Sequence, residues 1–132
     1  MNIRRLRPGD EAVVRELAER EPQTGLLSEE RTIFLVAFEH DRPIGFALAH
    51  ELPRRHGDPT NLFVYELGVD PEWRRRGIAT ALMNELAELA RNRGIREAFL
   101  ITEESNQAAM AFYESLGARR PAQDDVVWDL RY

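Results

Sequence analysis

The chain has 132 residues, of which 43% are hydrophobic and 31% charged, and its formal net charge is −5. This length and composition predict one folded domain over residues 1–132. The sequence contains no cysteine, which excludes disulfides and thiolate nucleophiles, and no lysine, which excludes Schiff-base chemistry and a lysine general base. Its negative charge argues against a nucleic-acid partner.

The spacing of apolar residues and turn residues predicts a mixed α/β domain. In chain order, the expected elements are a strand over Asn2–Arg7, a helix capped by Asp10, a short helix within Glu21–Arg31, a hairpin of Thr32–Glu39 with Pro43–Glu51, a central strand over Leu62–Val69, a helix over Gly77–Arg93, a strand over Glu97–Thr102, a helix from Asn106 to Gly117 and a last strand over Asp125–Arg131. The apolar character of the central strand predicts burial on both of its faces. The expected buried stripes of the helices are Val13, Val14 and Leu17, then Ile78, Leu82, Leu86 and Leu89, and finally Ala109, Phe112 and Leu116.

A basic, glycine-containing loop follows the central strand, with the sequence Arg74-Arg75-Arg76-Gly77-Ile78-Ala79. This loop opens a helix, whose first backbone N–H groups and positive dipole end favour a phosphate group. Gly77 lets a ligand approach the backbone closely, and each well-placed arginine adds a charge-assisted hydrogen bond of about 1.5–3 kcal/mol. The pattern is neither a Walker loop nor a dinucleotide fingerprint. The loop therefore predicts a pyrophosphate site.

Two blocks of the sequence resemble one superfamily. Arg74-x-x-Gly77-x-Ala79 is similar to the acetyl-CoA loop of GCN5-related N-acetyltransferases, and Asn106-x-x-Ala109-x-x-Phe112-Tyr113-x-x-x-Gly117 is similar to their downstream motif. Within the superfamily, the run from Phe63 to Met83 most resembles the type I aminoglycoside 3-N-acetyltransferases. The resemblance implies a mixed, mostly antiparallel sheet that is flanked by helices and splayed at its central strands. It also implies acetyl-CoA as co-substrate, bound by Val69, Arg74, Arg75, Arg76, Gly77, Ile78, Ala79, Thr80 and Asn106.

Glu66 lies in the otherwise apolar central strand, where a carboxylate is costly unless it is paired or near water. One interpretation is a general base that takes a proton from the acceptor ammonium, and the resembling family has an acidic residue here. The other is a buried ion pair with an arginine. Gly68 predicts either a β-bulge or a close approach of a helix. The resemblance implies that such a bulge admits the pantetheine arm beside Val69 and turns the Leu67 N–H toward the thioester carbonyl as an oxyanion donor.

Tyr113 follows Phe112 on the predicted C-terminal helix. One interpretation is a general acid that protonates the departing thiolate of CoA, and an ordinary phenol pKa near 10 is suitable for this role. The other is a core aromatic residue whose hydroxyl group is hydrogen-bonded. Asn106 is either only the N-cap of this helix or also a contact to the cofactor, as in the resembling family.

Two acidic pairs, Glu103-Glu104 and Asp124-Asp125, are either an acidic rim for a polyamine or solvated turn charges. Together with the net charge and the resemblance, they favour a cationic small-molecule amine as the acceptor, namely an aminoglycoside that is acetylated on its 3-amino group by direct attack. The alternatives are an N-acetyltransferase for a protein N-terminus, a polyamine or another metabolite amine, and a non-catalytic CoA-binding module.

No metal site is expected, because His40, His50 and His56 fit no metal-ligand spacing. No apolar run reaches membrane-spanning length, and the start of the sequence lacks an apolar signal segment. We therefore expect a cytoplasmic protein without a membrane partner, and we expect it to be a homodimer.

Overall fold

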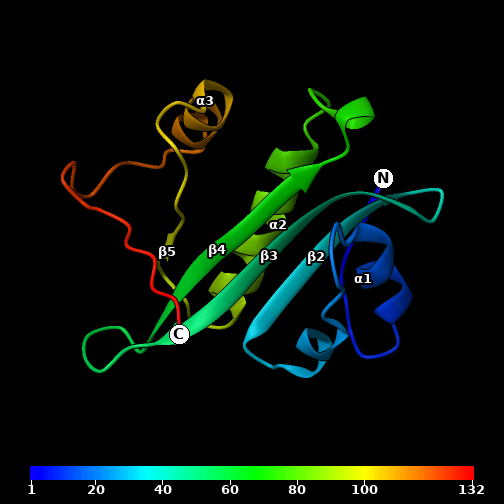
Figure 1. The fold of residues 1–132 in the computed structure, drawn as a ribbon, viewed down its shortest axis with the longest axis horizontal. Coiled ribbons are helices and arrows are strands. Elements are labelled where there is room, and N and C mark those ends of the chain that lie inside the picture. Colours follow the sequence, from blue (N-terminus) through cyan, green and yellow to red (C-terminus); the bar gives the residue numbers. More distant parts are fainter. The chain divides into compact units, whose positions relative to one another are not determined.

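The computed structural model describes residues 1–132 and separates them into two compact units, Met1–Ile101 and Thr102–Tyr132. In chain order the elements are β1 (Asn2–Arg5), α1 (Glu11–Leu17), the 3₁₀ helix η1 (Thr24–Ser28), β2 (Thr32–Glu39), β3 (Arg42–Pro53), β4 (Thr60–Val69), the 3₁₀ helix η2 (Pro71–Trp73), α2 (Ile78–Asn92), β5 (Ala98–Phe99) and α3 (Gln107–Ser115) (Figure 1). None of the helices has the length and apolarity that a bilayer crossing needs.

The first unit is built on one five-stranded sheet in the order β1-β2-β3-β4-β5. Neighbouring strands are antiparallel except β4 and β5, which run parallel and pair only at Leu62 with Ala98 and at Phe63 with Phe99. The second half of β4, residues 64–69, therefore has a partner on the β3 side and none on the β5 side. The sheet is mixed, mostly antiparallel and splayed between these two strands, as the resemblance stated above implies.

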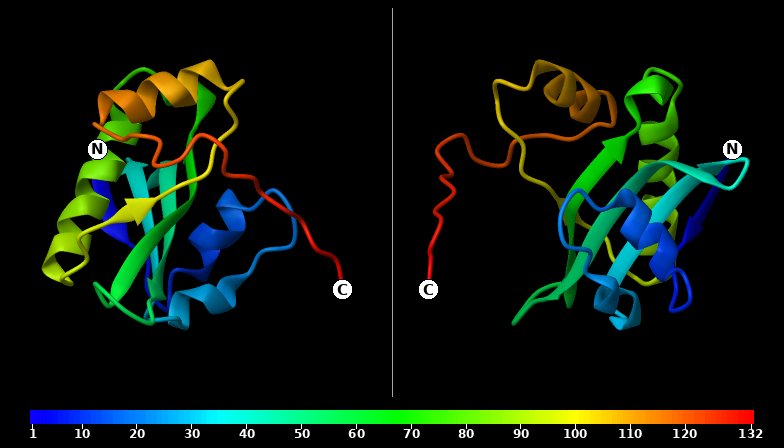
Figure 2. Two further views of the ribbon diagram at one scale, coloured as in Figure 1. Left: turned by 90° about the vertical axis from the view of Figure 1, so that its left-hand side faces the viewer. Right: turned by 45° about the vertical axis from the view of Figure 1, so that its right-hand side comes forward.

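Helices cover both faces of this sheet (Figure 2). On one face, here called the α2 face, α2 packs an i, i+4, i+8, i+12 stripe made of Ile78, Leu82, Leu86 and Ala90 against β2, β3 and β4. The last buried position is Ala90, while Leu89 is only partly buried. On the other face, here called the α1 face, α1 and η1 contribute Val14 and Leu27 to a second apolar cluster.

The second unit forms its helix as predicted but buries less of it than expected. The Asn106 Oδ1 atom accepts a hydrogen bond from the Ala109 N–H at 3.1 Å, and Gly117 ends the helix with a positive φ of 84°. No residue of α3 is fully buried, so the prediction of a buried stripe at Ala109, Phe112 and Leu116 was wrong; these side chains are half-buried.

Of two strand predictions near the C-terminus, one was too long and the other was wrong. The strand expected over Glu97–Thr102 shrinks to Ala98–Phe99, and residues 125–131 form no strand, with Val126 69% and Trp128 85% exposed. Alternation of apolar residues describes a strand only when another strand supplies its ladder of hydrogen bonds. The last segment pairs with no strand of the sheet, and its apolar side chains remain in contact with solvent.

Candidate cofactor and acceptor site

A β-bulge in β4 shapes the region before the basic loop. Leu48 of β3 lies opposite Glu66 and Ala49 lies opposite Val64, which leaves Tyr65 as the extra residue. The bulge is therefore at Tyr65, and the prediction that Gly68 forms it was wrong. Gly68 stays in register opposite Phe46, where an added Cβ would lie 2.7 Å from the Phe46 Cε1 atom. This glycine makes room for an aromatic ring on the neighbouring strand.

The bulge places Tyr65 and Glu66 together on the α1 face. Glu66 faces Leu48, which belongs to the apolar cluster of that face, and the Tyr65 ring lies 5.8 Å from that of His50. Tyr65 is 61% exposed and Glu66 is exposed, so the predicted burial of the central strand on both faces was wrong here. Glu66 forms no ion pair, which also removes the interpretation of a buried pair with an arginine. Its carboxylate is exposed and has no ion-pair partner.

The open side of β4 presents free backbone groups. The Asp70 N–H donates to the Ile44 carbonyl of β3 at 2.8 Å, so the preceding Val69 carbonyl points away from β3. Backbone groups alternate along a strand, and the N–H groups of Val69 and Leu67 therefore also point to the open side. The Arg74 Nε atom donates to the Val69 carbonyl at 3.4 Å, which agrees with a carbonyl that points away from β3. An extended ligand arm can pair with such a strand edge.

Asp70 organises the turn that follows β4. Its Oδ1 atom accepts from the Glu72 N–H at 2.9 Å, and its Oδ2 atom pairs with the Arg42 Nη2 atom at 3.1 Å. The turn continues through η2 into the arginine run, where the Arg76 guanidinium lies 4.8 Å from the centroid of the Trp73 ring. The sequence analysis did not identify Asp70, Arg42 or Trp73, although an Asp-Pro turn directly before the arginines signals a capped turn.

The basic loop leads directly into the N-terminus of α2. Gly77 is the N-cap in the left-handed conformation, with φ 78° and ψ 12°, and no atom lies within 4 Å of the place of a Cβ. The first hydrogen bond of the helix runs from the Ala81 N–H to the Gly77 carbonyl at 3.0 Å. The N–H groups of Ile78, Ala79 and Thr80 consequently have no partner within the helix. Three such donors at the positive end of a helix dipole suit a phosphate group.

A second glycine that the sequence analysis missed brings α2 close to the sheet. A Cβ added to Gly45 of β3 would lie 3.1 Å from both the Gly68 carbonyl oxygen and the Ile78 Cγ2 atom, and 3.4 Å from the Leu82 Cδ1 atom. Gly45 thus allows the first turn of α2 to pack directly on β3. The signal in the sequence is a glycine inside an apolar strand, which often marks a close approach.

The remaining predicted site residues belong to the second unit and are described within it. Asn106 uses its side-chain oxygen as the N-cap of α3. The Tyr113 ring lies 5.3 Å from that of Phe112, and partial burial raises the pKa of the Tyr113 phenol above its ordinary value. Glu104 pairs with Arg120 at 3.7 Å. Glu103, Asp124 and Asp125 are exposed and form no ion pair.

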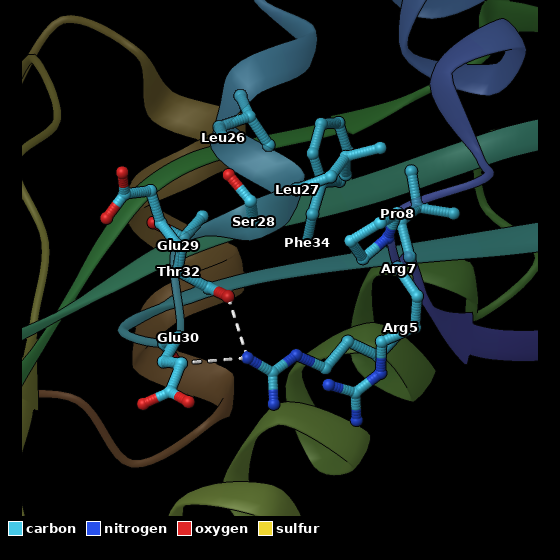
Figure 3. Close-up of a pocket in the computed structure, with 11 residues that line it drawn as sticks. Arg5, Arg7, Pro8, Leu26, Leu27, Ser28, Glu29, Glu30, Thr32 and Phe34 are labelled. Carbon is cyan, nitrogen blue, oxygen red and sulfur yellow. Dashed lines mark hydrogen bonds between the residues drawn. The ribbon is translucent and has the colours of Figure 1, made fainter.

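A pocket of about 220 Å³ lies between the end of β1, η1 and the start of β2 (Figure 3). Arg5 points toward the backbone here, and its Nη2 atom donates to the Glu30 and Thr32 carbonyls at 3.2 and 2.8 Å. Burial lowers the pKa of the Arg5 guanidinium below its ordinary value. Because carbonyl groups already occupy this guanidinium, and because none of the predicted site residues lines the pocket, we assign it no part in the site.

One continuous stretch of chain contains the open edge of β4, the arginine run and the free N–H groups of α2. Residues 3–118 match the Acetyltransferase (GNAT) family. The chain belongs to this family. Its GNAT fold explains why the sheet is splayed next to the basic loop.

Named relatives within the family differ in their acceptors. The chain is 39% identical over 82 residues to N-alpha-acetyltransferase 30 of Schizosaccharomyces pombe, an alignment that covers 62% of this chain and 54% of the relative. It is 37% identical over 111 residues to the mycothiol acetyltransferase of Kocuria rhizophila, covering 80% of this chain and 35% of the relative. The chain thus spans about half or less of the length of these relatives.

Among solved structures, an aminoglycoside acetyltransferase, HMB0005, from an uncultured soil metagenomic sample superposes with a TM-score of 0.87 at 27% identity. The superposition covers 99% of this chain and 97% of that structure.

Proposed function

We propose that this GNAT protein transfers the acetyl group of acetyl-CoA to an amine of an aminoglycoside. The observation that carries the proposal is the pairing of a phosphate-binding helix end with an open strand edge. The N–H groups of Ile78, Ala79 and Thr80 suit a pyrophosphate, and the free N–H groups of Leu67 and Val69 suit the amide-containing arm attached to it. A ligand with both parts in this order is CoA.

The reaction proceeds by direct attack, and the chain has no cysteine that could carry an acetyl group. Glu66 accepts a proton from the acceptor ammonium, and the amine nitrogen then forms a bond to the thioester carbon. The Leu67 N–H stabilises the negative charge that develops on the carbonyl oxygen. When the carbon–sulfur bond breaks, the sulfur takes a proton from the Tyr113 hydroxyl. The attached nitrogen gives up its second proton to the resulting phenolate, which restores the Tyr113 hydroxyl and leaves the neutral amide.

An aminoglycoside acceptor is favoured by charge and by the structural similarity to HMB0005. The four carboxylates of Glu103, Glu104, Asp124 and Asp125 would attract a polycation, and the chain as a whole carries a net charge of −5. The 3-amino group is the proposed position. The relatives named for protein N-terminal and mycothiol acetylation support other amines as the competing acceptors. We further propose a homodimer, supported by the exposed apolar side chains of Val126, Val127, Trp128 and Leu130 and testable by light scattering.

A panel of amines tests the proposal. Kanamycin, gentamicin, a peptide N-terminus and spermine are each incubated with acetyl-CoA, and released CoA thiol is measured together with the mass of the product. We expect aminoglycosides to be acetylated with the highest kcat/KM, and fragmentation of the product to place the acetyl group on the 3-amino nitrogen. Acetylation of only the peptide or of spermine would identify a different acceptor. Binding of acetyl-CoA without any product would identify a CoA-binding module.

Two variants test the assigned roles. Glu66→Gln and Tyr113→Phe should each lower kcat about 10²–10⁴-fold if these residues transfer protons. Matched controls are Glu85→Gln, on the exposed side of α2, and Tyr132→Phe, at the exposed C-terminus, which should leave kcat near the parent value. Parent-like turnover in both site variants would show that Glu66 and Tyr113 are not catalytic residues.

A further inference from the structure

A row of side chains crosses the α1 face of the sheet next to the proposed reaction centre. Thr32 lies opposite His50, His50 opposite Phe63, and Phe63 opposite Phe99, so the four residues are in register across β2, β3, β4 and β5. The Phe63 and Phe99 rings are stacked, with centroids 4.7 Å apart and planes 8° apart. At the other end, the Thr32 Oγ1 atom is 3.2 Å from the His50 Nδ1 atom, which fixes the imidazole ring.

The bulge adds a fifth member to this row. Tyr65 lies 5.4 Å from the Phe63 ring and 5.8 Å from the His50 ring, and Glu66 is its neighbour in the chain. Without the bulge, Tyr65 and Glu66 would point to opposite faces of the sheet. The bulge therefore joins an aromatic surface, made of His50, Phe63, Tyr65 and Phe99, to the carboxylate of the proposed general base.

This aromatic surface is exposed. Tyr65 is 61% and Phe99 40% exposed, whereas Phe34 and Leu48 on the same face are buried in the cluster with α1 and η1. Large apolar side chains that are exposed together and edged by polar groups mark ligand-binding surfaces. Ring faces attract ammonium groups, and the Glu66 carboxylate adds negative charge at one end of the surface. The chemistry matches a cation that also has rings with an apolar C–H face.

We propose that His50, Phe63, Tyr65 and Phe99 form a platform for the rings of an amino sugar. The proposal rests on the proposed function, because it assigns the acceptor of that reaction. The reacting amine lies at Glu66, and the sugar ring that carries it covers Tyr65. Glu66 and Phe63 lie opposite Leu48 and His50, which are two residues apart on β3. Since a strand rises about 3.3 Å per residue, Phe63 lies about 7 Å along the sheet from Glu66, which suits contact with a second, linked ring. The platform selects acceptors with linked rings over flexible chains of equal charge, which lose more conformational freedom on binding.

The test compares two acceptors in three proteins. The kcat/KM for kanamycin and for spermine, and the KM for acetyl-CoA, are measured for the parent, Tyr65→Leu and Phe99→Leu. Both substituted side chains are well exposed, and a thermal melt of each variant checks its fold. Tyr132→Leu, a substitution of the same type at an exposed terminal position, is the control. We expect the site variants to lose about threefold to thirtyfold in kcat/KM for kanamycin, to lose less for spermine, and to keep the parent KM for acetyl-CoA.

The outcomes separate this inference from the proposed function. If the parent acetylates kanamycin and the kanamycin-to-spermine ratio is the same in Tyr65→Leu, Phe99→Leu and the control, the platform is refuted while the proposed function stands. If the parent acetylates no amine, the proposed function fails, and calorimetry of kanamycin binding then decides the platform. Weaker kanamycin binding by Tyr65→Leu than by Tyr132→Leu supports it, and equal binding overturns it.

Discussion

Gly45 couples the packing of the sheet to the position of the phosphate-binding helix end. In Gly45→Ala, the new Cβ would lie 3.1 Å from the Gly68 carbonyl oxygen and 3.1 Å from the Ile78 Cγ2 atom, both closer than ordinary van der Waals contact. The carbonyl belongs to the backbone of β4 and cannot rotate away, and Ile78 is the first residue of α2. The contact with Ile78 is relieved by moving the first turn of α2 away from β3, and the contact with the carbonyl by a small separation of β3 from β4.

The expected cost follows from two opposing effects. Inserting a methyl group into a close-packed interface costs about 1–3 kcal/mol in the folded state. Replacing glycine by alanine returns about 0.4–1 kcal/mol by restricting the unfolded chain. The free energy of unfolding should therefore fall by about 1–2 kcal/mol, which for a chain of 132 residues lowers Tm by about 3–8 °C. Movement of the Ile78 N–H should also weaken acetyl-CoA binding, although Gly45 is not expected to contact the cofactor.

Calorimetry measures both quantities, Tm in a thermal scan and acetyl-CoA affinity in a titration. Gly25→Ala is the matched control, because Gly25 has no atom within 4 Å of the place of its Cβ and no positive φ. It should leave Tm unchanged or slightly raised and leave the affinity as in the parent. If Gly45→Ala shows the same Tm and the same acetyl-CoA affinity as Gly25→Ala, the contact of α2 with β3 at this glycine does not position the site.

Three further substitutions test the loop, an N-terminal ion pair and the acidic pairs. Gly77→Asp should abolish acetyl-CoA binding in a titration, since it puts a carboxylate where a pyrophosphate is expected. Hydrogen bonds from the Arg4 side chain and from the Arg7 N–H lower the pKa of Asp10 below its ordinary 3.8. The Asp10 carboxylate therefore stabilises the fold above about pH 4, and this stabilisation is lost as the pH falls through the folded-state pKa. Asp10→Asn should flatten the dependence of Tm on pH below about 4. Glu103→Gln with Glu104→Gln should raise KM for kanamycin, as should added salt in the parent, with little change in KM for acetyl-CoA.

Each of these expectations has a control. Gly94→Asp places the same residue at a similar positive φ, 73°, at the other end of α2, and it should keep acetyl-CoA affinity. Equal affinity loss in both glycine variants would mean that helix damage, and not charge, weakens binding. Glu85→Gln with Glu88→Gln removes two exposed carboxylates of α2 and should leave KM for kanamycin unchanged. An unchanged slope of Tm against pH in Asp10→Asn would contradict a stabilising role for that carboxylate.

Features that depend on a few neighbouring residues were predictable from the sequence. Gly94 terminates helix α2. The Gly94 N–H donates a hydrogen bond to the Arg91 carbonyl at 3.0 Å, and the Ile95 N–H donates one to the Ala90 carbonyl at 2.8 Å. A glycine that follows an amphipathic stripe signals this local arrangement. The cap of α3 at Asn106 and the basic loop at the start of α2 have the same local character. Their hydrogen bonds close within about five residues, so no other part of the chain has to be known.

Tertiary structure decided the features that depend on cross-strand register. The sequence analysis expected the distortion in β4 at Gly68, but Phe46 on the neighbouring strand occupies the space at Gly68 and the extra residue is Tyr65. That shift puts Glu66 on an exposed face beside aromatic rings. Residues 125–131 carry a strand pattern but have no paired neighbour. Local sequence thus determined where helices begin and end. The side chains of neighbouring strands determined toward which face of the sheet each residue of β4 points. The reason is that strand pairing depends on hydrogen bonds and side-chain packing between segments that are far apart in the chain.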